Sequence, residues 1–235
     1  SMFKNDYTKD IMETNLKYPS NCSITPFSFG FFIRIFLEES CNISFNLLSN
    51  GYFKLEDVSV ETVRSRLINP KEYWGGAYGV ASNTQVIKQA DIVAMLSMFK
   101  NDYTKDIMET NLKYYEPRTE HGSSLSACMY SLLACYTNNP EIAYPMFMKS
   151  AKTDLTKGGK EWLGLIYIGG THPASAGGAW IAAVKGFAGI NEEHGQLVCR
   201  PNLPEKWNGM NFKLIYKGKW YSVEIKDDKG TISMI

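Results

Sequence analysis

The run Glu-Pro-Arg-Thr-Glu-His-Gly-Ser-Ser, which ends at Ser124, places a cation, two carboxylates, an imidazole and two serine hydroxyls directly before an expected helix. The free N–H groups at a helix start bind anions, and Gly122 lets the backbone come close to a ligand. His121, Ser123 and Ser124 would add hydrogen-bond donors, which predicts a phosphate site. In the alternative, the serines only cap the helix and Glu120 only favours its dipole.

A second set of candidate residues lies on a helix expected over residues 84–99. Lys88, Gln89 and Asp91 combine a cation, an amide and a carboxylate within four residues. A polyol needs several fixed donors and acceptors on one wall, so Lys88 and Gln89 are candidates for binding a sugar. The same trio also fits a solvated helix face, and that alternative stays open.

Two further candidates are an aromatic residue and a histidine, each beside glycines. Trp74, in the run Tyr-Trp-Gly-Gly, would offer an aromatic platform for a sugar ring, although a tryptophan buried beside a turn is equally compatible. His172, in the run Gly-Gly-Thr-His-Pro, would face a ligand from a loop. A lone loop histidine is more often a hydrogen-bonded structural residue.

Composition excludes several classes of partner. The 25 basic and 24 acidic residues are interspersed and leave a formal charge of +1, so no basic face for nucleic acid is expected. An odd number of cysteines without C-x-x-C spacing argues against a disulfide framework and against a zinc site. Cys128 and Cys135 lie seven residues apart on one expected helix face and are predicted to be small core residues.

No segment has the features of a signal peptide or a membrane span. The most apolar stretch, residues 27–37, is broken by Arg34 and is shorter than the roughly 20 residues that a spanning helix needs. The sequence therefore predicts a cytoplasmic protein without a membrane partner.

Capping residues and hydrophobic periodicity predict the elements that position these candidates. Ser82 and Gln85 resemble a capping box before the helix at 84–99, and Asn139 followed by Pro140 supplies a cap and a first-turn proline. Helices are expected over residues 84–99, 123–136, 139–151 and 174–187. After residue 190, apolar residues alternate with polar ones between turn signals, which is typical of an antiparallel β-meander.

An exact internal duplication marks the N-terminal region. Residues 1–18 and 97–114 are identical at every position, whereas structural repeats diverge and recur along a chain. We interpret this as a recent duplication or an assembly fault, the alternative being a genuinely duplicated helix. Residues 1–49 stay unassigned; we expect a helical domain over 50–190 and a β domain over 191–235.

Six ordered segments carry a family resemblance over residues 50–235. They are NGYFKLEDV (50–58), EYWGG (72–76), TQVIKQADIV (84–93), YYEPRTEHGSSLS (114–126), LIYIGGTHPASAGGAW (165–180) and PNLPEKW (201–207). In order and spacing they resemble the later half of the disaccharide phosphorylases of glycoside hydrolase family 65, of the maltose, kojibiose and nigerose type.

The resemblance implies a mainly α fold, in which part of an (α/α)6 barrel precedes a small antiparallel β domain. It implies inverting phosphorolysis of an α-glucosyl disaccharide, with inorganic phosphate as co-substrate and β-glucose 1-phosphate and a free sugar as products. His121, Gly122, Ser123 and Ser124 would bind phosphate. Trp74, Lys88, Gln89, Glu120 and His172 would bind the sugar. No metal and no organic cofactor are implied, and a homodimer is.

The sequence departs from the family at one decisive point. The general acid of these enzymes is a glutamate in a stretch upstream of the matched segments, and no such stretch occurs here. A general acid typically contributes about 10²–10⁴-fold, so the isolated chain is expected to be weak or inactive. An inactive fragment that binds phosphate or sugar is the first alternative, and a hydrolase of the same clan is the second.

Overall fold

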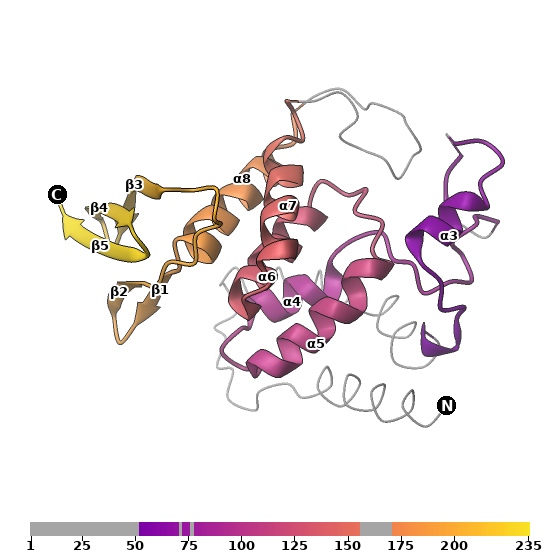
Figure 1. Cartoon of the computed structure of the whole chain (residues 1–235), viewed down its shortest axis with the longest axis horizontal. Coiled ribbons are helices and arrows are strands. Elements are labelled where there is room, and N and C mark those ends of the chain that lie inside the picture. Colours follow the sequence, from indigo (N-terminus) through magenta and orange to yellow (C-terminus); the bar gives the residue numbers. More distant parts are fainter. Residues whose placement is uncertain (1–51, 71, 76–77, 156–170) are drawn as a thin grey trace. The chain divides into compact units, whose positions relative to one another are not determined.

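The computed structural model describes residues 52–70, 72–75, 78–155 and 171–235, which form parts of two compact units (Figure 1). The first unit contains the described residues up to Ile68 together with Trp74–Ile87. The second contains Asn69–Tyr73 and Lys88–Ile235 where these are described. The first copy of the duplicated sequence lies outside the described residues.

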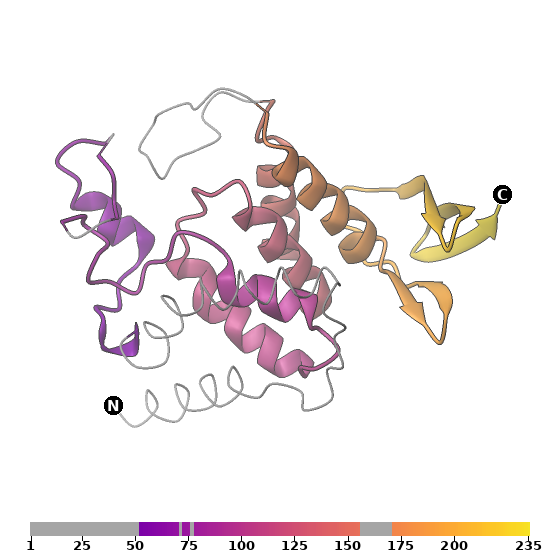
Figure 2. The same ribbon diagram turned by 180° about the vertical axis from the view of Figure 1, so that it is seen from behind.

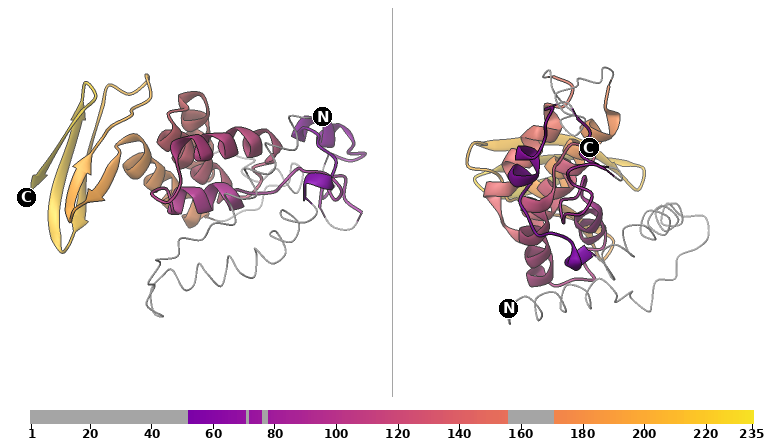
Figure 3. Two further views of the ribbon diagram at one scale, coloured as in Figure 1. Left: turned by 90° about the horizontal axis from the view of Figure 1, so that it is seen from below. Right: turned by 90° about the vertical axis from the view of Figure 1, so that its right-hand side faces the viewer.

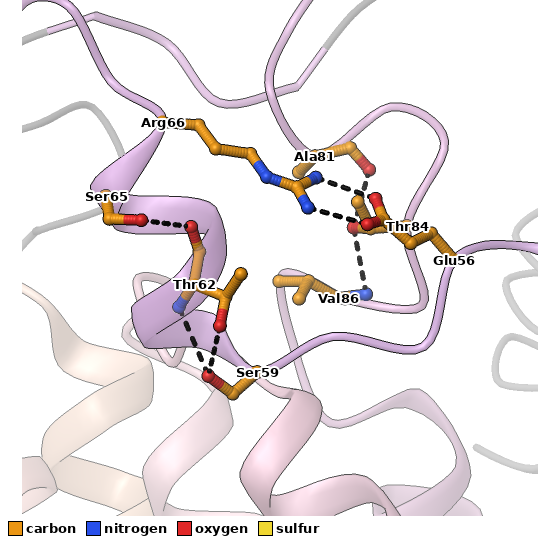
Figure 4. A network of polar contacts seen from close by, with 8 residues as sticks. All are labelled: Glu56, Ser59, Thr62, Ser65, Arg66, Ala81, Thr84 and Val86. Atoms are coloured by element: carbon orange, nitrogen blue, oxygen red, sulfur yellow. Dashed lines mark hydrogen bonds and ion pairs between the residues drawn. The ribbon is translucent and has the colours of Figure 1, made fainter.

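The first unit is organised around one short helix. Its elements are the 3-10 turn η2 (Tyr52–Lys54) and helix α3 (Val60–Ser65). Ser59 caps α3 because its hydroxyl accepts a hydrogen bond from the N–H of Thr62 at 3.1 Å (Figure 4). Arg66 ends the helix and donates to both carboxylate oxygens of Glu56, at 2.6 and 2.7 Å.

The expected capping box at Ser82 and Gln85 is wrong. The Ser82 hydroxyl donates to the carbonyl of Gly79 at 2.7 Å, and the buried Gln85 side chain donates to the carbonyl of Leu55 at 3.2 Å. Both side chains therefore stabilise loops of the first unit. The expected helix begins later, as α4 (Asp91–Met98), and Ala90 at its N-cap makes no side-chain capping bond.

The second unit begins with a series of helices. These are α4, α5 (Lys105–Tyr115), the 3-10 turn η3 (Glu116–Arg118), α6 (Ser126–Thr137), α7 (Pro140–Ala151), α8 (Pro173–Ile181) and the π-helical segment η4 (Ala182–Phe187). The helices expected over 123–136, 139–151 and 174–187 are thus confirmed, with shifted starts. Within the described residues, no helix combines the length and apolar character that crossing a membrane requires.

Helix α5 is formed by the second copy of the duplicated sequence. Thr104 caps its start, and Met108, Asn111, Leu112 and Tyr115 are its buried residues. These positions recur at intervals of three and four, so one face of the helix packs into the unit.

Helix α6 lies at the centre of the helical region, and ten of its twelve residues are buried. Asn138 ends it in the left-handed conformation at φ 60°, which lets the chain reverse into α7. The Ser131 hydroxyl donates to the carbonyl of Ala143 at 2.9 Å across this pair. Helix α7 therefore runs antiparallel to α6.

Helix α8 and η4 run parallel to α6. A Cβ atom added to Gly178 would lie 2.3 Å from the Cys128 sulfur, and one added to Gly186 would lie 2.9 Å from the Cys135 sulfur. From Gly178 to Gly186 the contacted residue on α6 changes from Cys128 to Cys135, so the two segments run in the same direction. Cys128 and Cys135 are buried free thiols, as predicted for core residues. Figure 2 shows α8 leading along the helical region toward β1.

The C-terminal part consists of a hairpin and a three-stranded meander, as the alternation predicted (Figure 3). The strands are β1 (Ile190–Glu193), β2 (Gln196–Cys199), β3 (Gly209–Tyr216), β4 (Lys219–Lys226) and β5 (Lys229–Met234). All pairs are antiparallel, and the meander has the order β3-β4-β5. Val223 and Ile225 on β4 form a core with Val184 of η4. The expected fold class, mainly α with a small antiparallel β domain, is confirmed.

Candidate functional site

The predicted phosphate loop connects η3 to α6. Glu120, His121 and Gly122 are buried, whereas Ser123 and Ser124 are partly exposed. The Ser123 hydroxyl accepts from the N–H of Leu125 at 3.3 Å, in the turn before the helix. The helix itself begins two residues later than the serine pair, and its N-cap residue makes no side-chain capping bond. The N–H of Ser126 donates to the carbonyl of Ser123 at 3.0 Å, so the chain itself closes the first turn and no N-cap side chain does.

His121 is held inside the protein beneath this loop. Its backbone is left-handed at φ 57°, an uncommon conformation for a residue other than glycine. Nδ1 lies 3.0 Å from the Ser126 hydroxyl, and the ring packs edge-on against Tyr130 at 4.6 Å. Burial, with a smaller contribution from the positive charge of Lys149, lowers the pKa of His121 to about 3. The ring is therefore neutral at physiological pH, and its buried Nε2 has no hydrogen-bond partner among the described residues.

Tyr130, against which the His121 ring packs, is itself held by a buried hydrogen-bonded group. The Thr119 hydroxyl lies 2.6 Å from the Tyr130 hydroxyl and donates to the carbonyl of Tyr115 at 2.8 Å. These hydrogen bonds join the end of α5 to α6. The conformation of the loop is thus set by packed neighbours, which is what a preorganised ligand loop requires.

His172 is the N-cap residue of α8. Its ring Nδ1 lies 2.5 Å from Oδ1 of Asp154, and its backbone N–H donates to Oδ2 of the same carboxylate at 2.7 Å. The side chain is only 11% exposed. His172 is thus fixed at a helix start by one acidic residue that follows α7.

The structure brings the phosphate loop and His172 to the same end of the helical region. Helices α6 and α8 are parallel and touch at Cys128 and Gly178, so their N-termini point the same way. Ser123 and His172 precede these contacts by five and six residues, so both lie at the N-terminal ends of their helices. Each helix N-terminus carries about half a positive charge. Together the two starts form an end of the molecule suited to an anion.

Helix α7 finishes at this same end. The hydroxyls of Ser150 and Ser175 lie 3.1 Å apart, and each also donates to the other residue's carbonyl at 3.0 Å. Lys149, in the last turn of α7, adds a positive charge near His121. Lys149 therefore lies at the same end of the helical region as the starts of α6 and α8 and the serine loop.

The other predicted residues occupy different surroundings. Lys88 and Gln89 precede α4 instead of lying on it, and the Gln89 amide donates to Oδ1 of Asp91 at 3.3 Å. Trp74 is 6% exposed and packs in the first unit with Val60 and Val63. A ring enclosed in this way offers no open platform, so the buried alternative for Trp74 holds.

Sequence reasoning missed Asp154, Lys149 and Ser126. Ser126 ends the segment 114–126 but was given no role, whereas Lys149 and Asp154 belong to no recognised motif, and Asp154 lies 18 residues before its partner His172. Only the fold brings them to the loop. Within the described part of the chain, no group of three His, Cys, Asp or Glu residues is placed to hold a metal ion.

Comparison with known proteins defines the class and then the family. The fold matches that of a solved protein from the human microbiome, provisionally named kojibiose phosphorylase, with a TM-score of 0.68 and 26% sequence identity over 80% of this chain and 27% of that one. The sequence matches the glycosyl hydrolase family 65 central catalytic domain over residues 31–181 and the C-terminal domain of that family over residues 191–235. The chain belongs to glycosyl hydrolase family 65.

Curated relatives extend this comparison. Nigerose phosphorylase of Lachnoclostridium phytofermentans is 58% identical over 186 residues, which are 79% of this chain and 25% of that protein. A 1,2-alpha-glucosylglycerol phosphorylase of Bacillus selenitireducens is 37% identical over 78% of this chain and 24% of its own length. A kojibiose phosphorylase of Halothermothrix orenii is 38% identical over 66% of this chain and 19% of its own. The chain thus spans about a quarter or less of each of these relatives.

Proposed function

We propose that this chain forms the phosphate-binding and sugar-binding wall of an inverting α-glucoside phosphorylase. The observation that carries the proposal is the parallel arrangement of α6 and α8, which places the serine loop and His172 at one end of the helical region. Backbone N–H groups at helix starts, together with hydroxyl groups, suit the oxygens of inorganic phosphate.

In the proposed reaction, a phosphate oxygen attacks the anomeric carbon while the glycosidic C–O bond breaks on the opposite face. The leaving oxygen takes a proton from a general acid, which we place outside this chain. Gly122, Ser123 and Ser124 would hold phosphate with His172, and Lys88 and Gln89 would hold the glucosyl unit. We propose no metal and no organic cofactor.

In this proposal His121 does not bind phosphate itself, although the sequence predicted it as a hydrogen-bond donor to phosphate. Because its imidazole is buried and neutral, it does not supply a positive charge to phosphate. It would act through its left-handed backbone and its contact with Ser126, which together shape the loop that carries the serines.

Nigerose is the first substrate to test, because the relative that shares 58% identity is a nigerose phosphorylase, while those named for kojibiose and glucosylglycerol share 38% or less. We also propose the domain division 50–190 and 191–235, and a homodimer for the complete enzyme.

A chimera tests the proposal. The matching 186 residues of this chain would replace their counterpart in the Lachnoclostridium phytofermentans nigerose phosphorylase. We expect phosphate-dependent release of β-glucose 1-phosphate from nigerose, and at least a tenfold loss when Ser123 and Ser124 are both changed to Ala. Hydrolysis of nigerose without phosphate would refute the proposal.

The second candidate function is phosphate or sugar binding without turnover. It is motivated by the lack of the general-acid stretch in this sequence. Calorimetry of the isolated chain with inorganic phosphate and with glucose would measure this binding. Turnover of nigerose by the chain alone would eliminate this second candidate.

A further inference from the structure

We propose that Asp154 is a positioning residue that fixes the ring orientation and the tautomer of His172, so that only Nε2 of His172 can meet a ligand. The inference deepens the proposed function, since His172 stands at the proposed phosphate end. The orientation that Asp154 gives to the His172 ring, however, does not depend on which ligand binds there.

The two oxygens of Asp154 hold two different parts of His172. Oδ1 lies 2.5 Å from ring Nδ1, and Oδ2 accepts from the backbone N–H at 2.7 Å. A carboxylate that binds both the backbone and the ring of one residue restricts χ1 and χ2 together. The same carboxylate lies at the positive start of α8, where a negative charge is favoured.

A buried hydroxyl cluster keeps Asp154 in register with His172. Ser175, in the first turn of α8, donates to the carbonyl of Ser150 at 3.0 Å and contacts the Thr153 hydroxyl at 2.9 Å. Ser150, Thr153 and Ser175 are all buried. Because Thr153 is adjacent to Asp154, the end of α7 cannot slide along α8 without breaking these bonds.

The pairing has a definite chemical consequence for the imidazole. A carboxylate only accepts hydrogen bonds, so Nδ1 must carry the proton that it donates to Asp154. Nε2 then accepts a hydrogen bond when the ring is neutral, and donates one when the ring is protonated. Without Asp154, neutral histidine in water favours the other tautomer, with the proton on Nε2.

Nuclear magnetic resonance of the full chain can test this directly, because it contains only three histidines. Long-range ¹H–¹⁵N correlation spectra distinguish the two tautomers of a neutral ring. At mildly alkaline pH we expect His172 of the wild type to carry its proton on Nδ1. In Asp154→Ala the proton should move predominantly to Nε2. His121 serves as an internal control, because its buried ring reports whether the fold around α6 persists.

Two further variants complete the design. Asp154→Asn keeps the shape and retains one acceptor oxygen, so His172 should show a mixture of tautomers. Asp228→Asn makes the same chemical change in the β4–β5 turn, at φ 57°, which Asn tolerates, and should leave His172 unchanged. A wild-type His172 with its proton on Nε2 would overturn the proposal. So would a tautomer that stays unchanged in Asp154→Ala while the signals of His121 are preserved.

A titration with inorganic phosphate separates this inference from the proposed function. If both hold, phosphate shifts the Nε2 resonance of wild-type His172, and the shift is lost in Asp154→Ala. An Nδ1-protonated His172 that does not respond to phosphate would support the positioning role of Asp154 and would count against phosphate binding by this histidine.

Discussion

Two adjacent glycines of α8 should respond in opposite ways to the same substitution. A Cβ atom at Gly177 would meet nothing within 4 Å, whereas one at Gly178 would lie 2.3 Å from the sulfur and 2.7 Å from the Cβ of Cys128. Rotation of the cysteine side chain can move its sulfur away, but its Cβ is fixed to the backbone of α6. Gly178→Ala therefore forces α6 and α8 apart, and Gly177→Ala does not.

The expected magnitudes follow from this geometry. Replacing glycine by alanine inside an exposed helix stabilises by about 0.5–1 kcal/mol, and this gain is common to both variants. Overpacking of a fitted contact costs about 1–3 kcal/mol and applies only to Gly178→Ala. The difference between the variants should therefore be about 1–3 kcal/mol, with Gly177→Ala the more stable. For a chain of this size each kcal/mol shifts Tm by about 2–4 °C.

Urea and thermal unfolding of the two variants and the wild type would measure this difference. The double variant Gly178→Ala with Cys128→Ala should recover part of the loss, because the sulfur contact disappears while the Cβ contact at 2.7 Å remains. Equal stability of Gly177→Ala and Gly178→Ala would refute the parallel packing of α6 on α8. The placement of His172 beside the serine loop would then lose its support.

Three other outcomes are expected. Burial lowers the pKa of His121 to about 3, below its ordinary value near 6.5, so between these pH values the unfolded state binds a proton that the folded state does not. The free energy of unfolding, measured with urea, should therefore fall as the pH drops from about 6.5 to 3, by up to about 1.4 kcal/mol per pH unit. His121→Gln should lose this pH dependence. Leu112→Ala should cost about 2–5 kcal/mol in the same assay, because the side chain is fully buried on α5. Trp74→Ala should cost about 3–5 kcal/mol in the unfolding of the first unit and leave phosphate binding, followed by calorimetry, unchanged.

Helices and strands were predicted where the residues that define them are neighbours in the sequence. Helix α7 begins at Pro140, as the sequence indicated, because proline needs no N–H partner in the first turn; Asn139 precedes it, but its side chain donates to the Thr137 hydroxyl at 2.8 Å and does not cap the helix. The meander of β3 to β5 was predicted from strict alternation, since its two faces have different surroundings. Both signals act over a few residues and are visible in a single sequence.

Other features depend on distant partners and could not be predicted in this way. Gln85 resembled the third residue of a capping box, yet its side chain bonds to Leu55, 30 residues away. Trp74 next to glycines resembled an open platform, but Val60 and Val63 enclose it. The Asp154 to His172 pair joins the end of one helix to the start of another, and its 18-residue separation follows no motif.

The proposed use of phosphate as the nucleophile has an electrostatic rationale. An inverting hydrolase would need a carboxylate on this wall to accept a proton from water. Two helix starts and Lys149 stabilise negative charge here, so they would lower the basicity of such a carboxylate. Asp154 already accepts two hydrogen bonds from His172, which weakens it further as a base. Under the proposed function, the same groups would favour phosphate, which brings its own nucleophilic oxygen and needs no base. Features that would slow hydrolysis therefore assist phosphorolysis.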